Sequence, residues 1–201
     1  MNRFKPGVML SALTLALVVI GCGRKDEETG GTDKTTPAYE PSSAATRAAA
    51  QATTVPLEGA AGDADFTGRF TITPEGTGVR VIADVAGVDT DGKHGLHIHE
   101  NGKCDHDAAV GKHFSSAGGH FNPAGVEHAC PPTEPRHAGD LGNIEISGSK
   151  GHLEVTATNL TADQLGGKAI ILHAGEDDCK TQPTGNSGDR IACGVVGRSE
   201  Q

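Results

Sequence analysis

Hydrophobic and polar residues alternate over short stretches from about residue 46 onward, and turn-forming residues separate these stretches. Residues 65–73 (DFTGRFTIT) and 79–85 (VRVIADV) show this alternation. Residues 74–76 (PEG) and 91–92 (DG) interrupt it and are typical of turns. A period of two residues is typical of half-buried β-strands, so this part of the chain is predicted to be β-structure.

Further strands are predicted after a long irregular stretch, at residues 142–146, 152–158, 168–173 and 190–196. No segment shows the sustained 3.6-residue period of an amphipathic helix, which argues against parallel α/β architectures. About eight short strands, closed into a barrel or a sandwich, suit a domain of this size. The predicted fold class is therefore all-β.

Two stretches lack strand character and are long for a compact domain, namely residues 100–140 and 174–189. Loops of this length are usually functional. The predicted domain also contains only four phenylalanines and no tryptophan. A core with so few large rings is expected to depend partly on disulfides and bound metals.

The N-terminus has the pattern of an export signal. A short basic start with Arg3 and Lys5 precedes an apolar run at residues 8–20, which is too short for a comfortable transmembrane span. The run ends in Val-Ile-Gly-Cys, which resembles the bacterial lipoprotein signal, with Cys22 as the acylated first residue of the mature protein. Residues 1–21 are then removed. An ordinary signal peptide with a coincidental cysteine is the alternative, and it also exports the protein.

Residues 22–45 are rich in glycine, threonine, proline and charge, so we expect the lipidated cysteine and a flexible tether ahead of a domain at residues 46–201. Loss of the signal changes the formal charge from −9 to −11, with 15 basic against 26 acidic residues. Such an acidic chain is a poor partner for nucleic acid or an anionic membrane surface. Membrane attachment is therefore expected through the lipid alone, in the bacterial cell envelope, either in the periplasm or at the cell surface.

Histidines form two groups with the chemistry of metal sites. One lies in a glycine- and proline-rich run and combines three imidazoles with one carboxylate, a donor set used by tetrahedral Zn(II): His120, His128, His137 and Asp140. In the other, His97 and His99 share one face of a predicted strand. Together with His120 and His173 they make four nitrogen donors, which suits Cu(II). His120 could then serve both ions through its two ring nitrogens.

Five motifs occur in a fixed order: HGLHIHE, GGHFNP, RHAGDLGN, ILHAGEDD and GDRIACGVVG. In this order and at these separations they resemble the copper/zinc superoxide dismutase family, over about residues 48–199. The resemblance implies a Greek-key β-barrel of eight strands, an immunoglobulin-like sandwich with two long functional loops. It also implies conversion of superoxide to dioxygen and hydrogen peroxide by Cu(II)/Cu(I) cycling, with a zinc ion nearby.

Position by position, the resemblance implies a role for each matching residue. The implied copper ligands are His97, His99, His120 and His173, and the implied zinc ligands are His120, His128, His137 and Asp140. His120 is implied as the bridging imidazolate, and Arg190 as the arginine beside copper that attracts superoxide. These two are the predicted catalytic residues. Asp177 is implied as the carboxylate that joins a copper histidine to a zinc histidine and orients both rings.

Four cysteines remain once Cys22 is assigned to the lipid, and an even number in an oxidising compartment predicts two disulfides. The resemblance implies one pair, Cys104–Cys193, which ties the ligand-bearing loop to the last strand. Cys130 lies two residues after His128, and Cys179 lies two residues after Asp177. If Asp177 contacts the ring of His128, the two chain segments meet there, so the second predicted pair is Cys130–Cys179.

Two other functions are open besides the enzyme. A dismutase-like module could bind copper without turnover, but such members typically lose a copper histidine or the arginine, and none is lost here. A structural, zinc-stapled surface lipoprotein leaves His97, His99 and His173 without a role. The sequence also leaves monomer and homodimer open.

The remaining histidines have plainer interpretations. His94 is expected to be a hydrogen-bonded framework residue. His106 and His113 are expected to be solvated loop residues in preference to an extra metal site, and His152 is expected to lie exposed on a strand.

Overall fold

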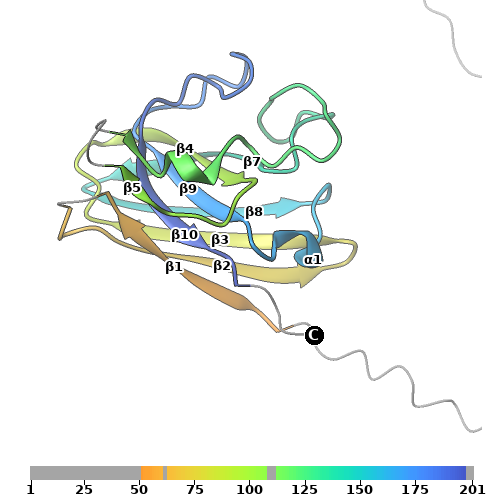
Figure 1. The fold of residues 1–201 in the computed structure, drawn as a ribbon, viewed down its shortest axis with the longest axis horizontal. Coiled ribbons are helices and arrows are strands. Elements are labelled where there is room, and N and C mark those ends of the chain that lie inside the picture. The colour runs from red at the N-terminus through yellow and green to blue at the C-terminus, as the bar shows by residue number, and fades with distance from the viewer. Residues whose placement is uncertain (1–50, 61–62, 108–111, 198–201) are drawn as a thin grey trace, which may run out of the picture. The chain divides into compact units, whose positions relative to one another are not determined.

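A computed structural model describes residues 51–60, 63–107 and 112–197, and its main feature is a closed antiparallel β-barrel (Figure 1). The barrel strands are β1 (Thr53–Gly59), β2 (Thr67–Glu75), β3 (Gly78–Ala86), β4 (Gly92–His99), β7 (Asp140–Ser147), β8 (Lys150–Ala157), β9 (Ala169–His173) and β10 (Arg190–Val195). Their order around the barrel is β1-β10-β9-β4-β7-β8-β3-β2, and β2 closes onto β1. Because β3 pairs with β8 and β4 pairs with β7 and β9, the chain crosses over as in a Greek key. The predicted all-β, eight-stranded fold is confirmed.

The alternating pattern at residues 79–85 produces the inner face of β3. Val79, Val81, Ala83 and Val85 are buried, whereas the residues between them are partly exposed. These side chains join a core made mainly of valine, isoleucine, leucine and alanine, in which Phe70 is the largest fully buried residue. A second, smaller cluster surrounds Phe114. The small number of aromatic residues therefore reflects a barrel filled by aliphatic side chains.

Two strands differ from the sequence prediction. The sequence does not predict β1. Only Val55 and Leu57 are buried in this strand, so its apolar pattern is short, and the proline between them normally argues against a strand. β2 continues through Pro74, which the sequence assigns to a turn. Pairing of β2 with β1 ends at Ile72, so Pro74 pairs only with β3 and its missing N–H costs no bond to β1.

Four short elements are also absent from the sequence prediction: β5 (His106–Asp107), β6 (Lys112–His113), the 3₁₀-helix η1 (Ser115–Ala117) and α1 (Ala162–Leu165). Three of them lie within the long stretch 100–140. In the described part of the chain, no helix has the length and hydrophobicity needed to cross a bilayer. The predicted signal at 1–21, the lipidated Cys22, the tether at 22–45 and the start of the domain at 46 lie outside the described residues.

Candidate metal centre

Neighbouring strands bring predicted copper ligands together with the predicted catalytic arginine. His97 and His99 are the last alternate residues of β4, and β4 pairs with β9, whose last residue is His173. On the other side of β9, Arg190 of β10 is the register partner of His173. His97 is in turn the register partner of Asp140 on β7. Strand register therefore places the predicted copper and zinc ligands side by side.

Two backbone hydrogen bonds attach the irregular loop to β4, and a third joins two residues of that loop. The N–H of Ile98 donates to the carbonyl of Gly139 at 2.9 Å, that of Phe121 donates to Ile98 at 2.8 Å, and that of Gly139 donates to Phe121 at 2.9 Å. A Cβ atom on Gly139 would lie 2.2 Å from the carbonyl oxygen of Ile98, so only glycine fits there. Each of the three residues neighbours a predicted ligand, so the bonds position His120 and Asp140 beside β4.

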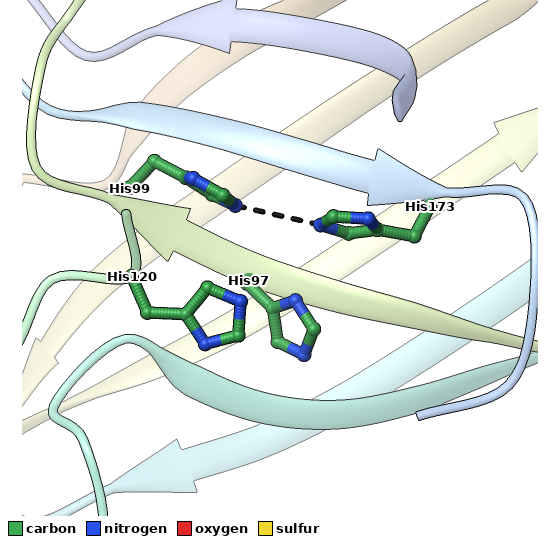
Figure 2. A group of neighbouring side chains, drawn as sticks. All are labelled: His97, His99, His120 and His173. Atoms are coloured by element: carbon green, nitrogen blue, oxygen red, sulfur yellow. Dashed lines mark hydrogen bonds between the residues drawn. The ribbon is translucent and has the colours of Figure 1, made fainter. Parts of the chain in front are cut away.

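Two buried groups of donor atoms result, and His120 belongs to both. Within each group the donor atoms lie within 4.8 Å of one another. The first group is His97, His99, His120 and His173. The second group is His120, His128, His137 and Asp140. Figure 2 shows the four rings of the first group converging from β4, from the segment at His120 and from the end of β9.

Hydrogen bonds at one ring nitrogen leave the other ring nitrogen free to bind a metal. Nδ1 of His99 lies 3.0 Å from the carbonyl oxygen of Gly118, and Nδ1 of His173 lies 3.2 Å from that of Gly188. A carbonyl only accepts, so each Nδ1 carries the proton and each Nε2 keeps its lone pair. The two Nε2 atoms are 3.4 Å apart (Figure 2). Such outer bonds fix the tautomer and orientation of a ligating imidazole.

Four ring nitrogens of these groups are buried and form no well-aligned hydrogen bond: Nδ1 of His97, Nε2 of His120, Nδ1 of His128 and Nδ1 of His137. Two of them, those of His128 and His137, lie close to the carboxylate of Asp140. An unsatisfied buried polar atom typically costs about 1–3 kcal/mol. Several in one place are therefore unfavourable unless something binds them. Their concentration in the two donor groups is what metal sites would show.

Asp140 is the carboxylate around which the second group is arranged. Its Oδ1 lies 2.9 Å from Nδ1 of His120 and 3.3 Å from Nδ1 of His137, and its Oδ2 lies 3.0 Å from Nδ1 of His128. Backbone N–H groups of Ala129 and His137 also donate to Oδ2. Burial alone would raise the pKa of this carboxyl, but the adjacent His120 and His128 hold it well below its usual range. Asp140 is therefore an anion at neutral pH.

Asp177 connects the two groups. Its Oδ2 accepts from Nε2 of His97 at 2.7 Å, and its Oδ1 accepts from Nε2 of His128 at 2.9 Å. The pKa of Asp177 is lowered by these contacts, against the opposing effect of burial. The side chain of Asn143 holds the backbone of Asp177 with two further bonds, to the carbonyl at 2.9 Å and from the N–H at 2.8 Å. The contacts that the sequence predicts for Asp177 are present, whereas the part played by Asn143 emerges only from the fold.

Burial keeps three imidazoles of the first group neutral. Desolvation lowers the pKa of His97 to about 4 and that of His173 to about 3, and it moves the pKa of His99 well below its ordinary value. In His128, burial is outweighed by the carboxylates of Asp140 and Asp177, which raise its pKa to about 9. Neutral imidazole is the form that binds a metal ion. His97, His99 and His173 are therefore in the metal-binding form at neutral pH.

The guanidinium of Arg190 is held beside the first group by two carbonyls. Nη1 donates to Phe114 and Nη2 donates to Gly118, each at 2.6 Å. Desolvation by burial lowers the pKa of Arg190, but an arginine remains charged at any physiological pH. The Gly118 carbonyl also accepts from His99, so the cation and a predicted copper ligand share one anchor.

Two disulfides are present, in the pairs predicted from the sequence. One joins the long loop after β4 to the barrel, and the other joins that loop to the loop after β9. Cys104–Cys193 links the start of the long loop to β10, with a Cα–Cα distance of 5.7 Å. Cys130–Cys179 joins the segment after His128 to the segment after Asp177, with a Cα–Cα distance of 5.0 Å.

Known proteins resemble this chain in fold and in sequence. A family model for copper/zinc superoxide dismutase matches residues 66–196. An extracellular copper/zinc superoxide dismutase of Drosophila melanogaster is 37% identical over 140 aligned positions, in an alignment that covers 64% of this chain and 72% of that protein. The Cu/Zn superoxide dismutase of Brucella abortus superposes with a TM-score of 0.63 at 27% identity, over 73% of this chain and 99% of that one. A double mutant of a SOD-like protein from Bacillus subtilis gives a TM-score of 0.61 at 32% identity, over 72% of this chain and 96% of that one. The chain therefore belongs to the copper/zinc superoxide dismutase family of enzymes.

Proposed function

We propose that this chain is an active superoxide dismutase with one copper and one zinc site that share His120. The proposed copper ligands are His97, His99, His120 and His173, and the proposed zinc ligands are His120, His128, His137 and Asp140. The observation that carries the proposal is the presence of two buried donor groups with one histidine in common.

The donor sets fit these metals. Four imidazole nitrogens suit copper, which nitrogen donors bind more strongly than other divalent first-row metals. Three imidazoles and a carboxylate suit zinc. The buried ring nitrogens of His97, His128 and His137 that form no well-aligned hydrogen bond would be satisfied by such ions. In the same way, Nε2 of His120 has no hydrogen-bond partner, while its Nδ1 lies beside Asp140.

Copper would supply the electron transfer by alternating between Cu(II) and Cu(I), while zinc has no redox role. The overall reaction takes two superoxide anions and two protons to dioxygen and hydrogen peroxide. His120 is then the residue placed to hold a proton at one ring nitrogen between the two half-reactions and to give it to the departing peroxide. Asp177 keeps His97 and His128 oriented meanwhile.

Arg190 attracts and orients the anion. Its two hydrogen bonds to backbone carbonyls use one N–H on each terminal nitrogen, so further N–H groups remain to bind superoxide. The chain is acidic, with a formal charge of −9, so a fixed local cation is needed to focus an anionic substrate.

The test compares superoxide consumption by the copper- and zinc-loaded protein with that of Arg190→Ala. We expect the variant to lose at least about tenfold in rate at unchanged metal content, since focusing of this kind contributes roughly 10- to 1,000-fold. Arg69→Ala is the matched control, because Arg69 is an exposed arginine paired with Asp84 on the barrel. A metal-loaded protein without turnover would instead identify a copper-binding module.

We also propose that the protein is exported and anchored by lipid on Cys22. The two disulfides support an oxidising compartment, and the relative from Drosophila melanogaster is named as extracellular. Cys22→Ser should release a soluble, active enzyme from the membrane fraction. A Ser variant that stays with the membranes would reject lipid on Cys22 as the anchor.

A further inference from the structure

Two histidines outside the proposed copper and zinc sets face each other in the β5–β6 hairpin. His106 and His113 are direct register partners, and their ring centroids lie 5.7 Å apart in an edge-to-face arrangement. The sequence favours two solvated loop residues, but the structure pairs them and partly buries His113. β6 also contacts β10, the strand that carries Arg190.

The separation of these rings matches that of rings proposed to share one ion. In the proposed copper set, His99 and His173 are 5.6 Å apart between centroids. In the proposed zinc set, His120 and His137 are 5.6 Å apart, also edge to face. A cross-strand pair at 5.7 Å is therefore spaced so that both rings can reach one metal ion.

The ring of His113 shares a structural feature with the rings of those proposed ligands. Its Nδ1 is buried without a hydrogen-bond partner, and in the described part of the chain every other unpartnered buried side-chain atom is a ring nitrogen of a proposed metal ligand. Phe114, which is fully buried, lies against both rings, with centroid distances of 4.8 Å to His106 and 6.0 Å to His113. Both imidazoles therefore rest against one fixed, buried ring.

We propose that His106 and His113 form a third metal site, which binds Cu(II) or Zn(II) through two imidazoles and completes its coordination with water. His106 is exposed, and His113 lines an open cavity of about 550 Å³, so water and ions reach the pair from solvent. Lys112 and Arg190 line the same cavity and oppose a cation, whereas Asp189, which also lines it, and Asp105, next to His106 in the chain, favour one. With two protein donors and nearby positive charge, the site binds more weakly than the proposed four-donor sites and exchanges its ion readily.

Titration of the copper- and zinc-loaded mature protein with Cu(II) tests the site, with calorimetry for stoichiometry and electron paramagnetic resonance for nitrogen coordination. The wild type should bind one further equivalent with nitrogen ligands. His106→Gln and His113→Gln should each lose that equivalent while keeping the first two metals and the melting temperature. His152→Gln is the control, since His152 is an exposed histidine paired with Asp84 on the barrel. No additional equivalent in the wild type, or one that persists in both single variants, would overturn the proposal.

Discussion

The side chain of Gln182 forms hydrogen bonds with both backbone groups of His128, a proposed zinc ligand 54 positions earlier in the chain. The N–H of His128 donates to Oε1 at 2.7 Å, and Nε2 donates to the carbonyl of His128 at 2.9 Å. The ring of the same histidine contacts Asp177, and the disulfide from Cys130 lies two residues on. The loop that follows β9 therefore holds the segment around His128 in three ways: through the backbone of His128, through its ring and through the disulfide at Cys130.

Replacing Gln182 with Leu removes both backbone bonds and is expected to weaken zinc binding by roughly tenfold or more, as loss of an outer partner of a metal ligand commonly does. The measurement is zinc affinity by competition with a chelator. Gln164→Leu is the matched control, because Gln164 also accepts from a backbone N–H, that of Thr161, but in α1. Equal zinc affinity in the two variants would contradict a positioning role for Gln182.

Loss of the Cys130–Cys179 bridge should affect both stability and zinc retention. The bridge spans 49 residues, for which the chain-entropy model gives an upper figure of roughly 4 kcal/mol in the free energy of unfolding. It also ends at Cys179, whose N–H donates to Oδ1 of Asp177 at 2.7 Å. We therefore expect the double Ser variant to unfold at lower urea concentration and to release zinc faster.

The comparison variant lacks Cys104 and Cys193, whose bridge spans 89 residues. The entropy model gives it a similar loss of stability, but its cysteines do not bond Asp177 among the contacts described. If zinc release is equally fast in both double variants, the faster release reflects a general loss of stability and not a specific effect on the segment that carries Asp177. Peptide mapping without reductant checks the pairing itself, and a link from Cys130 to Cys104 or Cys193 would contradict it.

The strand pattern and the histidine motifs can be predicted because the relevant signals are local. Alternation in β3 is visible within a single short segment, and the i, i+2 spacing of His97 and His99 places both on one face of a strand, whereas His120 is grouped with them through the family resemblance. Gln182 carries no such signal, since a glutamine in a loop rich in glycine and proline is an ordinary residue until the fold brings His128 to it. The β5–β6 hairpin escapes prediction for a related reason, because strands of two residues show no period.

The stability of the metal-free protein should pass through a maximum near pH 6.5. Between pH 6.5 and about 4, the unfolded chain binds protons that the buried His97 does not, so the free energy of unfolding falls as pH falls. The shift of His97 alone corresponds to roughly 3 kcal/mol. His128 acts in the opposite direction: its raised pKa stabilises the folded state below pH 6.5, and that contribution is lost as pH rises towards 9. Urea midpoints of chelator-treated protein from pH 4 to 9 measure both slopes, and a flat acid limb would contradict the buried neutral histidine.

Replacing His173 with Ala should abolish dismutation while leaving a folded domain that still binds zinc. His173 belongs only to the proposed copper set, and its Nδ1 is bonded to the loop carbonyl of Gly188, so the barrel core does not depend on it. His99→Ala should behave in the same way, because His99 is likewise confined to that set. The measurements are superoxide consumption, metal content and far-ultraviolet circular dichroism of each purified variant.

His137→Ala provides the opposite case, because His137 belongs only to the proposed zinc set. This variant should lose zinc before copper and keep measurable dismutation when copper is supplied. If His173→Ala keeps full activity, the copper assignment is wrong. If it loses zinc as readily as His137→Ala does, the two donor groups do not act as separate sites. The proposal of one copper and one zinc site that share His120 is then wrong.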